Sequence, residues 1–136
     1  MAQDWAFEEK LELRNSKGIV FMYYGLDRKA KWFKSFLKTT TVANLDQLFA
    51  EESADLIFYG HQHIASDFTG RSRYVNLGSA GCFDKAEVRL GILHISEDGF
   101  KLEKHSLSYD DEGLMEAYDL RQVPARDFIR TNFLTR

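Results

Sequence analysis

The stretch Ala54-Asp-Leu-Ile-Phe-Tyr-Gly-His-Gln-His-Ile64 decides how the rest of the chain is arranged. Its apolar run, residues 56–59, lies between an acidic residue and Gly60, and a run this short is typical of a buried strand. His61 and His63 follow at the carboxyl end of that strand, where open α/β sheets bind ligands. Because Gly60 has no side chain, the backbone can turn sharply there and bring both imidazoles toward one point.

On spacing alone, two interpretations of His61 and His63 are open. Neutral imidazole is a common ligand for transition metals, and clusters of histidine and carboxylate hold such ions, so the pair is a candidate metal site. The alternative is a solvated surface loop in which both histidines bind nothing. The context of the motif in the rest of the chain favours the metal site.

The composition predicts one ordinary folded domain, residues 1–136. Of these 136 residues, 44% are hydrophobic and 29% are charged, which is enough for a real core. The net charge of -3 gives no broad attraction to nucleic acid. One cysteine, Cys82, excludes an intrachain disulfide and suits a reducing cytosol. With no signal-peptide pattern and no apolar run of membrane-spanning length, we expect a cytoplasmic protein without membrane contact.

The first half of the chain predicts a β-α-β unit with a parallel pair of strands. Residues 19–24 form the strongest strand pattern, and residues 55–59 form the second strand. Between them, Asp27 is expected to cap a helix that runs to Leu37, and Asn44 a second helix that ends at residue 52. This helical connection is what parallel strands require.

The second half changes to antiparallel strands, arranged as two hairpins. The predicted hairpin strands cover residues 64–68, 73–77, 88–95 and 100–107. Two helices close the chain, one capped by Asp110 or Asp111 and one with Pro124 in its first turn. The predicted fold class is therefore α/β (α+β), a β-α-β unit followed by antiparallel hairpins and two C-terminal helices.

Two motifs together carry a resemblance to a known family. Gly60-His-Gln-His63, preceded by a strand, is followed by a hairpin whose second strand runs Tyr74-Val-Asn-Leu-Gly-Ser79. This resembles the C-terminal half of the calcineurin-like metallophosphoesterases, most closely the small bacterial phosphodiesterases and diadenosine-polyphosphate hydrolases. An Asn-Pro-Gly-Ser strand end is common in that family, and Leu77 stands here in place of the proline. The resemblance covers residues 16–136 and implies half of a β-sandwich flanked by helices.

The resemblance also implies a chemistry. In that family the two histidines of Gly-His-x-His serve different ions of a two-metal centre, which would assign His61 and His63 one each. The paired ions, manganese, iron or a similar divalent metal, polarise a phosphoester and activate a bridging water. The implied activity is hydrolysis of a small phosphomonoester or phosphodiester, including nucleotides.

The departures from the family pattern are as informative as the match. The family's site also needs an Asp-x-His, a Gly-Asp-x-x-Asp and an Asn-His pair, and none of the three occurs in this sequence. Tyr23 and Tyr24 stand at the strand end where a further histidine ligand is expected. Only His61 and His63 remain, one imidazole per ion, whereas zinc-type sites take three or four protein ligands. We therefore assign no catalytic residue and expect the isolated chain to be inactive.

Two hypotheses from different classes follow. In the first, the chain is a truncated or split metallophosphoesterase half whose parent activity needs residues found elsewhere. In the second, it is a non-catalytic binding or oligomerisation module derived from that fold. Both predict apolar surface that another half would cover, and hence a twofold homodimer or a complementing chain.

Overall fold

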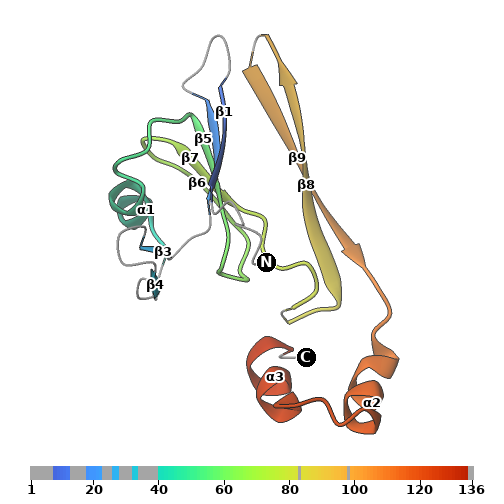
Figure 1. The fold of residues 1–136 in the computed structure, drawn as a ribbon. Helices are drawn as coiled ribbons and strands as arrows, with labels where there is room; N and C mark the ends of the chain where they lie inside the picture. The colour runs from blue at the N-terminus through green and yellow to red at the C-terminus, as the bar shows by residue number, and fades with distance from the viewer. Residues whose placement is uncertain are drawn as a thin grey trace, which may run out of the picture.

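The computed structural model describes residues 8–12, 18–22, 26–27, 32–33, 40–82, 84–97 and 99–134, which form a mixed α/β fold of small sheets and three helices (Figure 1). The strands are β1 Glu8–Leu11, β2 Ile19–Met22, β3 Leu26–Asp27, β4 Trp32–Phe33, β5 Leu56–Tyr59, β6 Ser66–Thr69, β7 Arg73–Asn76, β8 Glu87–Ser96 and β9 Gly99–Ser108. The helices are α1 Val42–Leu48, α2 Glu112–Leu120 and α3 Arg126–Phe133. None of these helices is long and apolar enough to cross a membrane.

The main sheet has five strands in the order β1-β2-β5-β7-β6. The pairs β2–β5 and β5–β7 are parallel, whereas β1–β2 and β6–β7 are antiparallel. The predicted parallel pair and the predicted first hairpin are therefore confirmed. β5 lies in the middle of the sheet with all four of its side chains buried, so the strand that precedes the histidines is anchored on both sides.

The predicted helix from Asp27 to Leu37 is wrong wherever the structure describes it. Asp27 lies in β3 and does not cap a helix, and Trp32–Phe33 forms β4, which pairs with β3 in antiparallel register. Aromatic residues favour extended backbone, and here that preference prevails over the apolar spacing that suggested a helix. The rest of that predicted helix lies outside the described residues.

Helix α1 begins at Val42, and its cap is Thr41, not the predicted Asn44. The Thr41 backbone is extended, and its hydroxyl oxygen accepts a hydrogen bond from the backbone N–H of Asn44 at 3.2 Å. Threonine and asparagine both serve as caps, and the earlier of the two starts this helix. Leu45 and Phe49 are buried on its inner side, as the spacing predicts.

Two apolar clusters cover opposite faces of the main sheet, because side chains alternate along β5. Ile57 and Tyr59 point toward α1, and Leu56 and Phe58 point toward the β8–β9 hairpin, which lies on the other side (Figure 1). The helix-side cluster contains Leu45, Phe49, Ala54, Ile57, Tyr59 and Tyr74. The hairpin-side cluster contains Leu56, Phe58 and Val75, with Leu77, Leu93, Phe100 and Leu102 packed against it.

The second hairpin and the C-terminal helices complete the described chain. β8 and β9 pair antiparallel over all ten residues of each strand, which confirms the second predicted hairpin. Asp111 is the N-cap residue of α2, and the Asp110 carboxylate accepts from the backbone N–H of Glu112 at 2.9 Å. Pro124 precedes the N-cap of α3 and does not lie in its first turn, because Ala125 turns the chain in a left-handed conformation with φ 55 before the helix starts.

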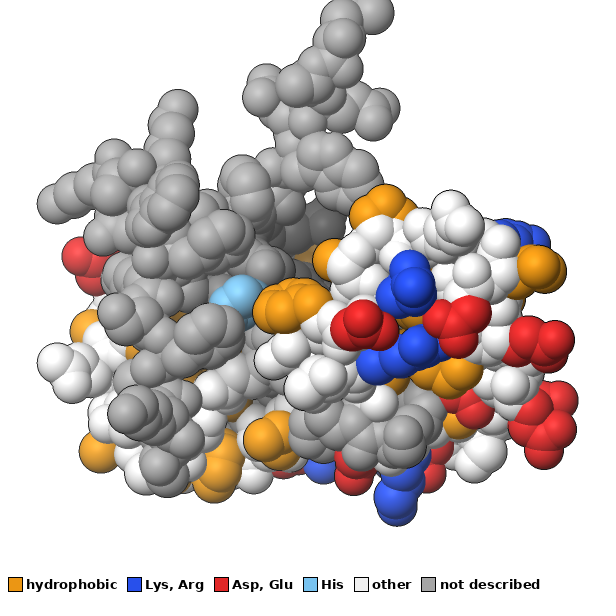
Figure 2. Space-filling model, turned by 90° about the horizontal axis from the view of Figure 1, so that it is seen from below, with side chains coloured by type: hydrophobic (Ala, Val, Ile, Leu, Met, Phe, Trp, Pro, Cys, Tyr) orange, Lys and Arg blue, Asp and Glu red, His pale blue; other side chains and the backbone are white. Residues whose placement is uncertain are grey.

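Arginine–aspartate contacts hold α2 and α3 together. The Arg130 guanidinium donates to the Asp119 carboxylate and to the backbone oxygen of Met115, each at 2.8 Å. Arg126 lies 3.0 Å from the other Asp119 oxygen. Figure 2, which views the molecule from below, shows acidic and basic side chains interspersed over the C-terminal helices. This pairing ties the last helix to the helix before it.

Candidate functional site

The histidine loop leaves the carboxyl end of β5 and is tied to segments far away in the sequence. Thr40 Oγ1 donates to the Gln62 side-chain oxygen at 2.8 Å, and Asn76 Nδ2 donates to the Gln62 backbone oxygen at 2.8 Å. The Asn76 side-chain oxygen in turn accepts from the backbone N–H of Gly78 at 2.8 Å. Asn76 is only 2% exposed, so one buried amide joins the histidine loop to the segment after β7.

The two histidines have different surroundings. His61 has a φ of 78, a left-handed conformation that is uncommon outside glycine, and its side chain is half-buried. Burial lowers the pKa of His61 below 6.5, and the neighbouring His63 lowers it further. The His63 ring packs against the Phe133 ring of α3, with ring centroids 5.8 Å apart. The C-terminal helix thus contacts the loop that carries the proposed ligands.

These residues do not fit a complete metal centre. Within the part of the chain that the structure describes, no group of three histidine, cysteine, aspartate or glutamate side chains could hold a metal ion. Protein metal sites of the zinc type take three or four such ligands, and a two-metal centre needs more. His61 and His63 remain a pair of imidazoles on one loop, and Tyr23 and Tyr24 lie outside the described residues. No step of a metal-dependent reaction can be derived from this arrangement.

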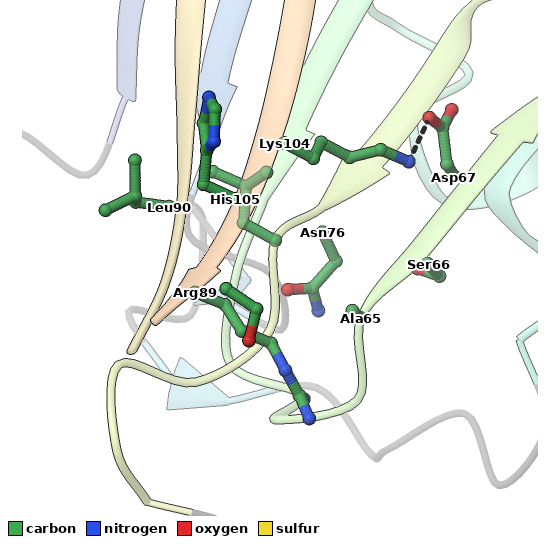
Figure 3. Close-up of a pocket in the computed structure, with 10 residues that line it drawn as sticks. Ala65, Ser66, Asp67, Asn76, Arg89, Leu90, Lys104 and His105 are labelled. Carbon is green, nitrogen blue, oxygen red and sulfur yellow. Dashed lines mark hydrogen bonds and ion pairs between the residues drawn. The ribbon is translucent and has the colours of Figure 1, made fainter. Parts of the chain in front are cut away.

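A cavity of about 390 Å³ opens beside the histidine loop, between the β6–β7 hairpin and the base of β8–β9 (Figure 3). Asp67 and Lys104 face each other across it, with the Lys104 ammonium 2.8 Å from the Asp67 carboxylate. Arg73 donates to both Asp67 oxygens, at 3.0 and 2.8 Å. The Arg73 hydrogen bond and the Lys104 contact together lower the pKa of Asp67 to about 2. Asp67 therefore stays ionised at neutral pH and cannot act as a general acid there.

Arg89 brings a second cation to the same cavity, next to the histidine loop. Its guanidinium lies 3.5 Å from Glu87 and 3.7 Å from Asp84. Gly78 has a φ of +91, and a Cβ placed on it would lie 3.1 Å from Arg89 Cδ and 3.2 Å from the His63 backbone oxygen. Glycine therefore lets Arg89 pack closely over the loop. Asp67, Lys104 and Arg89 each form an ion pair with an oppositely charged side chain of the same chain. This favours a structural role for these charges over binding a charged ligand.

The two histidines are predicted from the sequence, whereas the charged network beside them is not. Asp67 and Arg73 lie on neighbouring strands of a hairpin that the sequence does predict, so a search for opposite charges across that hairpin could have found the pair. Lys104 comes from a strand 37 residues further along, and no local signal joins it to Asp67.

No protein-family model and no curated protein matches the sequence. Among solved structures, the chain is similar to hypothetical protein PH1004 from Pyrococcus horikoshii OT3, with a TM-score of 0.68 and 14% identity, over 96% of this chain and 51% of that chain. It is also similar to Vacuolar Protein Sorting 29 from Cryptosporidium parvum, with a TM-score of 0.40 and 16% identity, over 76% of this chain and 57% of that one. The similarity to Vps29 from Entamoeba histolytica complexed with Zn²⁺ has a TM-score of 0.38 and 17% identity, over 78% and 63% of the two chains.

These similarities concern the fold. The chain shares its fold, distantly, with the Pyrococcus protein over nearly its whole length. The similarities to the Vps29 structures are weaker, and the zinc is a property of the Entamoeba protein. The expected resemblance to the metallophosphoesterase family stays a prediction. The chain spans about half the length of the Pyrococcus protein. Any activity or partner of a protein of that full length can therefore only be proposed for this chain.

Proposed function

We propose that this chain is a metallophosphoesterase-like module that does not hydrolyse phosphoesters by itself and that acts by associating with another polypeptide. The observation that carries the proposal is the missing third ligand beside His61 and His63 among the described residues. The loop is otherwise well built, since Gln62 is held by Thr40 and by the buried Asn76. A loop that is held by these hydrogen bonds but has too few metal ligands fits a binding or oligomerisation module.

One observation favours a second candidate function. The match covers 96% of this chain but 51% of the Pyrococcus chain, so half of that fold has no counterpart here. If another polypeptide supplies the remaining half, His61 and His63 are this chain's contribution to a manganese- or iron-type centre. The activity would then be hydrolysis of a small phosphoester or nucleotide, in the cytoplasm.

Hydrolysis of bis(p-nitrophenyl) phosphate by the purified chain in added Mn²⁺ tests the first proposal. We expect a rate equal to that of the double variant His61→Ala, His63→Ala. The matched control is His94→Ala, which removes an exposed imidazole on β8 that does not line the cavity. Turnover that the double variant abolishes and His94→Ala retains contradicts the proposal. Equal turnover in all the proteins would come from a contaminating enzyme. It would agree with the expectation that the unaltered chain and the double variant have the same rate.

A further inference from the structure

Among the residues that the structure describes, the outer edge of β9 is an open row of backbone hydrogen-bonding groups. Tyr109 N–H donates to the Ala86 oxygen at 2.9 Å, one step beyond the end of the β8–β9 ladder. Hydrogen-bonded and non-hydrogen-bonded pairs alternate in an antiparallel ladder, so the odd-numbered residues of β9 bond to β8. The even-numbered ones, which include Phe100, Leu102 and Lys104, point their N–H and C=O groups outward. Within the described chain, no backbone hydrogen bond joins these three to another segment.

The opposite edge of the hairpin is partly used already. At the base of β8, Arg89 N–H donates to the Ser79 oxygen at 3.4 Å, and Ala80 forms a bridge with Val88. Of the two edges, β9 therefore presents the longer one that no other described segment pairs with, and long unpaired edges are templates for pairing with another chain. An inward-pointing lysine is one device that protects such an edge, but Lys104 is neutralised by Asp67 at 2.8 Å.

We propose that β9 pairs antiparallel with β9 of a second copy of this chain, about a twofold axis at Leu102. This deepens the proposed function by naming the module's partner, and it rests on that function. In this register Leu102 faces its own counterpart and Phe100 lies opposite Lys104, and each such pair exchanges two backbone hydrogen bonds. The pairs extend the hairpins of two copies into one continuous sheet, as isologous twofold contacts do.

Charge complementarity selects this register. It places Lys101 of each copy directly opposite Glu103 of the other, in the pairs whose side chains approach most closely. Within one chain Lys101 Nζ already lies 2.7 Å from Glu103, which also lies 3.5 Å from His94 and 4.0 Å from His105. The Lys101 and Glu103 side chains are 74% and 37% exposed, so both can reach a neighbouring strand. Moving the axis to Lys104 instead brings the two Lys104 side chains opposite each other and separates Lys101 from Glu103.

Sedimentation velocity on the full chain at micromolar concentration tests the interface through a charge swap. We expect twice the monomer mass for the unaltered chain. Lys101→Glu and Glu103→Lys each place like charges opposite one another, and we expect each to raise the dimer Kd by about tenfold or more. The combination of both changes restores attraction and is expected to restore the dimer. Glu116→Lys, the same charge change at an exposed position of α2, is the matched control and is expected to leave the mass unchanged.

A crosslink gives a second readout that does not depend on affinity. In a Cys82→Ser background, Lys101→Cys combined with Glu103→Cys is expected to form a disulfide between chains under mild oxidation, and circular dichroism verifies that the variant folds. A monomeric unaltered chain, a double charge swap that fails to restore the dimer, or a folded cysteine variant that does not crosslink overturns the interface. A monomer without turnover would overturn the β9 interface and leave the proposed lack of hydrolysis in place. A dimer with turnover that depends on His61 and His63 would overturn the proposed lack of hydrolysis and leave the interface in place.

Discussion

Replacing Asp67 with asparagine should destabilise the chain by an amount that can be worked from its contacts. The Asp67 carboxylate accepts two hydrogen bonds from Arg73, at 3.0 and 2.8 Å, and one from Lys104 at 2.8 Å. Its pKa falls from 3.8 to about 2, and each pH unit corresponds to ~1.36 kcal/mol. The Asp67 side chain is 22% exposed, so some screening applies. We expect Asp67→Asn to lower the free energy of unfolding at pH 7 by about 1 to 2 kcal/mol.

Urea unfolding of the unaltered chain and of Asp67→Asn, across a pH series, measures this difference. The pKa of Asp67 is lower in the folded chain than in the unfolded one, so its contribution is complete above pH 3.8 and is lost as the pH falls toward 2. The stability difference between the two proteins should therefore be constant near neutrality, shrink by about half by pH 3 and nearly vanish at pH 2. In thermal unfolding at pH 7 the variant should melt about 3 to 8 °C lower.

Either of two results would contradict this role of Asp67. A difference below about 0.5 kcal/mol at pH 7 would mean that the three contacts do not stabilise the folded state more than water does. A difference that persists unchanged at pH 2 would mean that asparagine destabilises by packing and not by the loss of the charge. Val75→Leu is not a suitable control, because it alters the core; Glu116→Gln is, since it makes the same carboxylate-to-amide change at an exposed position of α2.

Three further substitutions test the structure by chemical denaturation. Thr41→Ala removes the oxygen that accepts from Asn44 N–H, and we expect a loss of about 1 kcal/mol; no loss would mean that α1 is not capped there. Leu45→Ala, at a fully buried position, should lower the free energy of unfolding by about 2 to 5 kcal/mol. Leu120→Ala, at a position that is 82% exposed, should change it by less than about 0.5 kcal/mol. Equal effects of the two substitutions would contradict the assignment of Leu45 to the core. Asn76→Ala removes the hydrogen bonds of this amide to the Gly78 N–H and to the Gln62 oxygen, and a cost below about 1 kcal/mol would show that the amide does not hold the histidine loop.

The parts of the fold that the sequence predicts well are those with strong local patterns. The apolar run before Gly60 predicts β5, and the turn signals around Gly70 and Gly99 predict both hairpins. The spacing of Leu45 and Phe49 predicts the buried side of α1. In each case a local feature favours one kind of element: the short length of the run for β5, the turn residues for the hairpins and the helical spacing for α1.

The failures arise where two physical preferences compete. Trp32–Phe33 has apolar spacing that suits a helix and aromatic side chains that suit a strand, and pairing with β3 decides the outcome. Thr41 and Asn44 are both competent caps, and spacing alone cannot rank them. Pro124 suits a first helical turn, but Ala125 adopts a left-handed conformation and the helix begins only at Arg126.

The candidate site shows the same division. His61 and His63 are visible in the sequence as a motif, and the structure places them on one loop at the end of β5. The contact between His63 and Phe133 joins positions that are 70 residues apart in the sequence. It depends on how α3 packs against the histidine loop. Such long-range packing leaves no trace in local periodicity.

The most direct test of the central claim is the metal stoichiometry of the purified chain after equilibrium dialysis against Mn²⁺ or Zn²⁺. We expect no stoichiometric metal, and no difference between the unaltered chain and the double variant His61→Ala, His63→Ala, because too few ligands lie together among the described residues. Close to one or two ions per chain, lost in the double variant, would contradict this expectation and would show that further ligands complete the site.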